Sequence, residues 1–301
     1  MTMCGIVGLF LKNPDLQSEL GLLTSQMLKV MTERGPDSAG FAVYGGARRG
    51  QTKITVRGVA PAQAARFEKG LADIAGPEIT MTCRDDHTVI TLPTEHEKTA
   101  RRFIDAFGHG ITFVSSGDSI ELYKGVGLPE DVATRFDLAG MRGTHAIGHT
   151  RMATESAVTT AGAHPFSTGP DQCLVHNGSL SNHNTLRRQL VREGLKFATE
   201  NDSEVAAGYL SWRLSHGERL DEALTASLTD LDGFYTFVVG TRDGFAVLRD
   251  PVACKPAVIA ETDDYVAFAS EYRAFARLPG IGQATVFEPE PQRVYHWEHA
   301  A

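Results

Sequence analysis

The sequence has few cysteines, no long hydrophobic run and no excess of basic residues. Its four cysteines are scattered over 301 residues without a Cys-x-x-Cys pair, which predicts neither a disulfide framework nor a cluster site and favours a reduced, cytoplasmic protein. No apolar stretch reaches the roughly 18–20 residues of a membrane helix, and we expect no secretory signal. With 29 basic and 37 acidic residues the net charge is −8, which disfavours nucleic-acid binding.

Length and hydrophobic pattern predict one large domain with an insertion. A chain of 301 residues can bury a full core without disulfides, and short strands mixed with a few long helices, such as 180–193, indicate an α+β layered domain. Within residues 52–125 the expected order is β-α-β-β-α-β, as in a ferredoxin-like fold. Its final strand is expected as a pair, 111–115 and 119–124. We expect this segment to be a subdomain inserted in a domain of residues 1–301.

Cys4 has a structural and a functional interpretation. A lone cysteine in an apolar segment is usually a small, buried hydrophobic residue. If processing made Cys4 the first residue, its thiol would lie next to a free α-amino group. Such an amine has a pKa of about 8, so a fair fraction is neutral at physiological pH and can take the thiol proton. This internal base is the principle of the N-terminal nucleophile hydrolases.

Three further segments also have two interpretations each. Arg151 could form a surface salt bridge worth at most ~1 kcal/mol, or it could bind a substrate carboxylate through two parallel hydrogen bonds. Asn177-Gly178 is a favoured hairpin turn, but the Asn177 amide and the Gly178 N–H could also form an oxyanion hole. Asp202 could belong to a helix cap or present its carboxylate to an ammonium group. Together with Cys4, these residues would suit an α-amino acid whose side-chain carbonyl is attacked.

Ordered motifs make the chain similar to the class II glutamine amidotransferases. These motifs are Cys4-Gly5-Ile6-Val7-Gly8, Arg34-Gly35-Pro36-Asp37-Ser38-Ala39-Gly40, His149-Thr150-Arg151-Met152-Ala153-Thr154, Ala163-His164-Pro165, His176-Asn177-Gly178 and Asp202-Ser203-Glu204. The match is extended by Arg249-Asp250-Pro251, Lys255-Pro256 and Ala269-Ser270-Glu271. The resemblance covers the whole chain except the insertion and the C-terminal residues after the Ala269-Ser270-Glu271 motif. It implies an αββα four-layer sandwich, and hydrolysis of glutamine to glutamate and ammonia through a thioester.

The resemblance also implies roles for single residues. Cys4 is expected as the nucleophile, and Asn177 and Gly178 as the oxyanion hole. Arg151 and Asp202 are expected to hold the glutamine carboxylate and amine.

Other positions are expected to support the site. Thr154 is an expected pocket contact, whereas Arg34 and His164 are expected to shape the site without touching the scissile bond. His145 and His149 suggest a metal pair, but this region has the pattern of a strand, where i and i+4 side chains do not form the chelate they form on a helix. We therefore expect no metal site.

Two features depart from the family pattern. Met152 stands where family members usually have an aromatic residue, which concerns the pocket wall and not the reaction. Thr2-Met3 precede Cys4 and would have to be removed to free the catalytic amine. If they stayed in place, the chain would be a non-catalytic structural or regulatory subunit with Cys4 blocked.

The pattern of the chain also suggests partners. No phosphate-cradling loop of the Walker type is present, and we expect the ammonia to be used on another polypeptide. A free-standing chain with this insertion resembles the amidotransferase subunit of split glutamate-synthase-like enzymes, above all that of N-methylglutamate synthase. The resemblance implies a hetero-oligomeric complex whose synthase subunits carry FMN and an iron–sulfur cluster, with no cofactor in this chain.

An alternative within the same complex is that the site handles a γ-glutamyl donor. By elimination, we expect the insertion to contact a partner.

Overall fold

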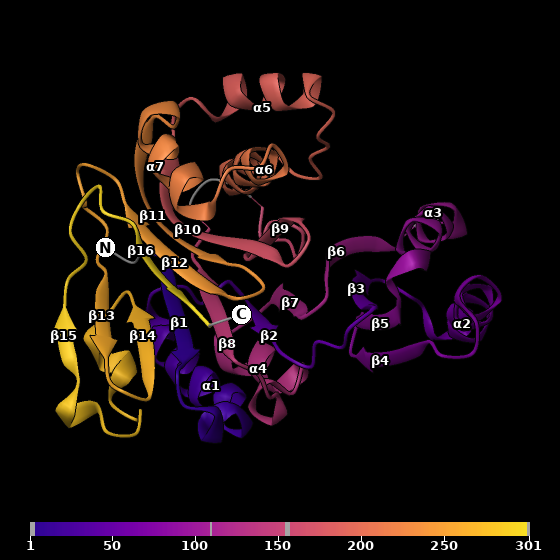
Figure 1. Ribbon diagram of the computed structural model, residues 1–301, viewed down its shortest axis with the longest axis horizontal. Coiled ribbons are helices and arrows are strands. Elements are labelled where there is room, and N and C mark those ends of the chain that lie inside the picture. Colours follow the sequence, from indigo (N-terminus) through magenta and orange to yellow (C-terminus); the bar gives the residue numbers. More distant parts are fainter. Residues whose placement is uncertain (1–3, 109, 154–156, 300–301) are drawn as a thin grey trace.

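Two antiparallel sheets stacked face to face form the main body of the molecule (Figure 1). The computed structural model describes residues 4–108, 110–153 and 157–299. The seven-stranded sheet has the order β15-β13-β14-β1-β8-β2-β7, with β1 (Gly5–Leu11), β2 (Ser38–Tyr44), β7 (Ile120–Val126), β8 (His145–Arg151), β13 (Val258–Glu261), β14 (Tyr265–Ala269) and β15 (Thr285–Phe287). The five-stranded sheet has the order β16-β12-β11-β10-β9, with β9 (Phe166–Gly169), β10 (Gln172–Leu180), β11 (Gly233–Gly240), β12 (Gly244–Arg249) and β16 (Tyr295–Glu298).

Helices cover the outer face of each sheet. The seven-stranded sheet packs against α1 (Leu20–Val30) and α4 (Pro129–Arg135). The five-stranded sheet packs against α5 (His183–Arg192), α6 (Asp202–Ser215) and α7 (Leu220–Asp230). The short 3-10 helices are η1 (Pro14–Ser18), η2 (Met31–Glu33), η3 (Thr94–His96), η4 (Leu138–Gly140), η5 (Tyr272–Phe275) and η6 (Ile281–Gln283). The expected αββα four-layer sandwich is therefore confirmed (Figure 1).

The pattern of β1 explains this layering. Side chains of successive strand residues point to opposite faces of a sheet. Val7 and Leu9 pack into the core beneath α1, whereas Ile6 and Phe10 pack between the two sheets. Because both faces of β1 are buried, its sequence is a continuous apolar run rather than an alternating one.

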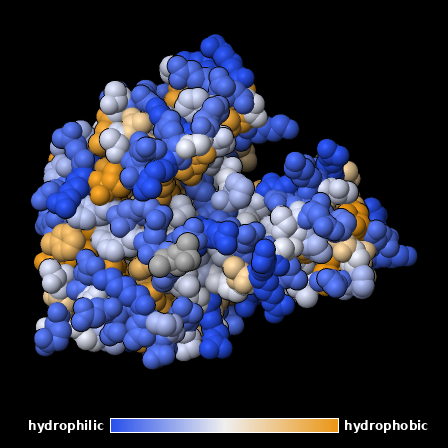
Figure 2. Space-filling view, viewed as in Figure 1, coloured by the Kyte–Doolittle hydropathy of each residue, from blue (hydrophilic) through white to orange (hydrophobic). Residues whose placement is uncertain are grey.

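The insertion forms a third, four-stranded antiparallel sheet of order β4-β5-β3-β6. Its elements are β3 (Gln51–Arg57), α2 (Pro61–Ala75), β4 (Thr80–Arg84), β5 (His87–Pro93), α3 (Glu97–Phe107) and β6 (Thr112–Gly117). Residues of both helices share one core with the strands, including Phe67, Leu71 and Ile104. The chain order and the strand order are those of a ferredoxin-like fold. Figure 2 shows the insertion as a smaller lobe beside the sandwich, with a largely hydrophilic surface.

The expected final strand pair of the insertion is divided between two sheets. β6 pairs with β3 in the four-stranded sheet, but β7 pairs with β2 in the seven-stranded sheet. Ile120 and Leu122 of β7 pack between the layers of the sandwich. The four-stranded sheet thus ends at Gly117, and the expected range of 52–125 extends past it into a strand of the main body. None of the helices within the described ranges is both long and apolar enough to span a membrane.

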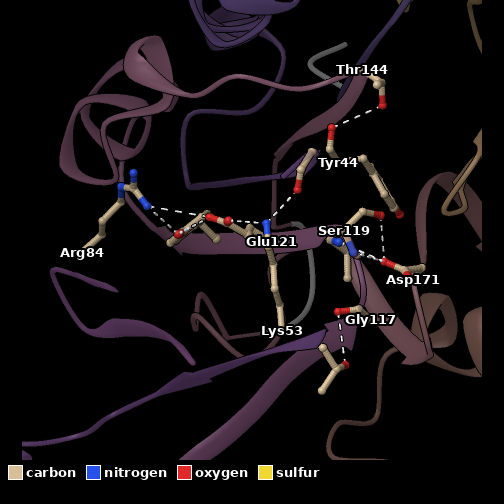
Figure 3. Close-up of polar contacts among 12 residues, drawn as sticks. Tyr44, Lys53, Arg84, Gly117, Ser119, Glu121, Thr144 and Asp171 are labelled. Carbon is tan, nitrogen blue, oxygen red and sulfur yellow. Dashed lines mark hydrogen bonds and ion pairs between the residues drawn. The ribbon is translucent and has the colours of Figure 1, made fainter. Parts of the chain in front are cut away.

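A polar joint connects the insertion to the sandwich (Figure 3). The Lys53 Nζ donates to the Gly45 carbonyl and to Glu121, each at 2.7 Å. On the other side, Asp171 in the turn between β9 and β10 accepts four hydrogen bonds from the turn between β6 and β7. The donors are the Asp118 N–H at 2.7 Å and the Ser119 N–H, Ser119 hydroxyl and Ile120 N–H at 2.9 Å each. Asp171 therefore connects residues 118–120, where the insertion joins the sandwich, to the five-stranded sheet.

Removing this carboxylate should destabilise the whole chain. Asp171→Ala leaves buried N–H and hydroxyl donors without an acceptor, and we expect the free energy of unfolding to fall by about 2–4 kcal/mol. Chemical denaturation of both proteins measures this loss. The matched control is Asp263→Ala in an exposed turn, which should change stability by less than about 0.5 kcal/mol. Equal effects of the two substitutions would contradict the role of Asp171.

Candidate active site

A cleft of about 650 Å³ lies where the start of β1, the end of β8, β10 and the start of α6 meet. Its walls include most of the residues expected from the sequence, namely Cys4, Arg151, His164, Asn177, Gly178 and Asp202. These residues are far apart in the chain, and each is held by a different part of the fold. Thr154 lies outside the described residues.

Cys4 is half-buried and directly precedes β1. Its Sγ lies 3.8 Å from the Met152 carbonyl oxygen and accepts the Met152 N–H at 3.5 Å. Burial raises the pKa of the Cys4 thiol, and the Met152 hydrogen bond and the positive charge of Arg151 oppose this only in part. The thiol is therefore mostly protonated at neutral pH and needs a base to become a nucleophile.

The backbone of Cys4 is held by two side chains. Its carbonyl oxygen accepts the Arg34 Nε–H at 3.1 Å and the Asn177 Nδ2–H at 3.0 Å. Arg34 also forms an ion pair with Glu271 at 2.9 Å. Arg34 thus holds the backbone of Cys4 and is not among the residues that line the cleft; its role in shaping the site stays a prediction.

Asn177 and Gly178 lie inside a strand and not in a turn. β10 continues to Leu180 and pairs with β11 along its whole length, with Asn177 opposite Thr236. The hairpin interpretation of Asn177-Gly178 is therefore wrong. Gly178 has a φ of +152°, and a Cβ there would overlap the Phe234 carbonyl oxygen, so the position requires glycine. The glycine allows the two strands to approach beside the cleft.

Charges of opposite sign line the same cleft. Arg151 is the last residue of β8, and only 7% of its surface is exposed. Asp202 is the first residue of α6, and its Oδ2 accepts the Leu180 N–H at 2.9 Å. The cap of this helix is Asn201, whose side chain accepts the Ser203 N–H. Asn201 thus fulfils the capping role, whereas Asp202 lines the cleft and its Oδ1 accepts the Ser203 hydroxyl at 3.3 Å.

Histidines form part of the cleft wall. The ring of His164 stacks on that of His149, with centroids 4.0 Å apart. Burial lowers the pKa of His164 well below its usual range and that of His149 to about 3, so both rings are neutral at physiological pH. His176 lies at the other side, where its Nδ1 is 2.9 Å from the Ser203 hydroxyl. Burial also lowers the pKa of His176, although the negative charge of Asp202 opposes this, so none of these rings adds charge to the site at physiological pH.

Lys255 and His183 also line the cleft, although neither was expected there as a site residue. The Lys255 Nζ lies 5.0 Å from the centroid of the Phe234 ring. Its positive charge also lowers the pKa of the Cys4 thiol slightly. The Lys255-Pro256 motif was a usable signal for this residue. His183 carried no comparable signal in the sequence.

The chain is similar to known glutamine amidotransferases. A family model described as a glutamine amidotransferase domain matches residues 149–277. The glutamine amidotransferase-like protein GlxB of Rhizobium meliloti is 57% identical over 298 residues, which cover 99% of each chain. A putative glutamine amidotransferase of Methanothermobacter thermautotrophicus is 32% identical over 309 residues, which cover 97% of this chain and 99% of that protein.

The fold is also similar to that of a solved structure. The glutamine phosphoribosylpyrophosphate amidotransferase from B. subtilis, complexed with ADP and GMP, aligns with a TM-score of 0.61 and 22% sequence identity. The alignment covers 98% of this chain and 49% of that one. At this identity the likeness concerns the fold alone.

The raised pKa of Cys4 gives a testable pH dependence. While residues remain attached ahead of Cys4, its alkylation by iodoacetamide should be slow at pH 7 and should keep rising beyond pH 9, the ordinary thiol value, because only the thiolate reacts. Mass spectrometry of the Cys4 peptide measures the rate, with the exposed Cys83 and Cys254 as internal references. A rate for Cys4 that levels off below pH 8 would show that its pKa is not raised.

Proposed function

The chain belongs to the class II glutamine amidotransferases, and from this we propose that it hydrolyses glutamine to glutamate and ammonia through a thioester on Cys4. The observation that carries the proposal is the convergence on one cleft of a thiol, a guanidinium and a carboxylate, namely those of Cys4, Arg151 and Asp202. An α-amino acid has the complementary pair of charges. Arg151 would bind its carboxylate through parallel hydrogen bonds, and Asp202 would bind its ammonium group.

The chemistry assigns a proton acceptor to Cys4 itself. Once the residues before it are removed, its α-amine takes the Sγ proton, and the thiolate attacks the side-chain carbonyl carbon of glutamine. The amine returns this proton to the departing nitrogen, so that ammonia leaves and a thioester remains. Water then hydrolyses the thioester to glutamate and regenerates the thiol.

Asn177 and Gly178 would stabilise the negative oxygen that develops during both steps. The Asn177 amide has two N–H donors, of which one is bonded to the Cys4 carbonyl. The second remains for the oxyanion, together with the Gly178 N–H. Loss of one such donor typically lowers kcat by ~10²–10³-fold.

The mechanism requires that everything ahead of Cys4 be cleaved off. An amine that is part of a peptide bond has no lone pair available to accept the thiol proton. The alternative function is a non-catalytic structural or regulatory subunit in which Thr2-Met3 stay attached and block Cys4. The two functions differ in the first residue of the mature chain.

We further propose that the ammonia passes to a synthase partner in a cytoplasmic, glutamate-synthase-like complex, such as N-methylglutamate synthase. FMN and an iron–sulfur cluster would belong to the partner subunits. The sheet topology supports this proposal. Every strand in the described ranges belongs to the sandwich or to the insertion, so these ranges contain no further sheet that could form an acceptor domain. The insertion, which projects from the sandwich (Figure 1), is the proposed partner contact.

The nucleophile is tested by labelling and by N-terminal sequencing. The purified wild-type chain should begin at Cys4, hydrolyse glutamine and form a covalent adduct on Cys4 with a diazo-ketone analogue of glutamine. Cys4→Ala should lose both the adduct and the hydrolysis, because no other group supplies the thiolate, whereas the control Cys83→Ala should retain both. Hydrolysis by a chain that still carries Thr2 would overturn the mechanism, and an unprocessed, inactive chain would support the structural alternative.

The partner is tested by purifying the native complex through a C-terminal tag. We expect a stoichiometric second chain with flavin absorbance, and transfer of ¹⁵N from the side-chain amide of labelled glutamine to the product of that chain. The Cys4→Ala complex is the control and should assemble without transferring nitrogen from glutamine. Recovery of the tagged chain alone, without flavin, would contradict the proposed complex.

A further inference from the structure

Residues 157–165, which belong to no helix or strand, form a loop that makes up one wall of the cleft. Ala157, Thr159, Gly162 and His164 of this loop all line the cleft. The Ala157 carbonyl oxygen accepts a hydrogen bond from Arg151 at 3.5 Å. The position of the loop therefore affects the width of the cleft and the orientation of the guanidinium.

Lys124 holds this loop from β7. Its Nζ donates to the carbonyl oxygens of Ala161 at 3.2 Å, Ala163 at 2.9 Å and Pro165 at 3.4 Å. It also lies 4.6 Å from the centroid of the Phe166 ring, a distance at which a cation and an aromatic face attract each other. In its protonated form, Lys124 has three N–H donors for these three backbone acceptors.

The loop also packs directly on the seven-stranded sheet. Lys124 lies opposite Gly40 in the pairing of β7 with β2. A Cβ at Gly40 would overlap the His164 carbonyl oxygen, so the loop backbone touches the backbone of β2. The sheet and the lysine together define where residues 161–165 lie.

A lysine is costly to place in this environment. Burial lowers the pKa of Lys124 to about 7, although the negative charge of Glu204 opposes the shift and Arg57 adds to it. A buried amine of this kind is destabilising unless its donors are used. Without Lys124, the three carbonyl groups would in turn lose their shared donor.

We propose that Lys124 is a positioning residue for glutamine binding. Its amine fixes the backbone of residues 161–165, and this sets the cleft wall and, through Ala157, the guanidinium that receives the substrate carboxylate. The inference rests on the proposed glutaminase function. It assigns Lys124 an effect on substrate binding and none on the thiol chemistry, since Lys124 is not among the residues that line the cleft.

Kinetics of Lys124→Met test this assignment, because methionine keeps the side-chain length but removes all donors. The KM for glutamine should rise about tenfold, while kcat changes by less than about twofold. Lys124→Arg restores donors and should recover part of the affinity. The matched control is Lys53→Met, which removes another lysine that is bonded to a backbone carbonyl and does not line the cleft; its KM should equal that of the wild type.

Hydrogen exchange supplies a measurement that does not depend on turnover. The amides of residues 157–163 should exchange faster in Lys124→Met than in the wild type and in Lys53→Met.

If Lys124→Met does not fold, Lys124→Gln, which keeps two N–H donors without the charge, takes its place. Unchanged exchange and unchanged KM in a folded variant would overturn the role of Lys124. A wild type that neither binds nor hydrolyses glutamine would overturn the proposed function, and the exchange data would still test the contact.

Discussion

The site depends on a central strand that is paired on both edges and buried on both faces. β1 hydrogen-bonds to β14 on one side and to β8 on the other. Its side chains belong alternately to the core under α1 and to the core between the sheets. A shift of one residue would exchange these two sets, so the register is strongly determined. Cys4, the residue just before this strand, is placed beside Met152 for the same reason.

The apolar segments predicted an α+β layered domain, and the ordered motifs, through the family resemblance, predicted the four layers and six residues that the structure brings together in one cleft. Such motifs are informative without knowledge of distant contacts. Short sequence patterns were ambiguous at positions whose structure is determined by pairing with residues distant in the chain. Asn-Gly favours a turn in isolation, but at Asn177-Gly178 the pairing of β10 with β11 over the whole strand prevails. Likewise, Asp202 could have belonged to the helix cap, but the fold uses the side chain of Asn201 as the cap.

The joint of the insertion could not be predicted from the sequence. The apolar alternation of residues 120–122 suits either sheet, and only packing places β7 in the sandwich. Asp171 is 53 residues away from Asp118 in the chain, and Lys124 is 37 residues or more from the carbonyls that it contacts. No periodicity or motif links such pairs. These two residues nevertheless connect the insertion, the sandwich and the cleft wall.

The two hydrogen bonds to the Cys4 carbonyl have a consequence for maturation of the chain. Arg34 and Asn177 donate hydrogen bonds to the carbonyl oxygen on the C-terminal side of Cys4. Hydrolysis of the peptide bond before Cys4 would therefore not release the residue from the site. The new terminus would keep only rotation about its own N–Cα and Cα–Cβ bonds. Little ordering entropy would then be lost when amine and sulfur align. A cut at this place would produce a terminus that is already anchored for its reaction.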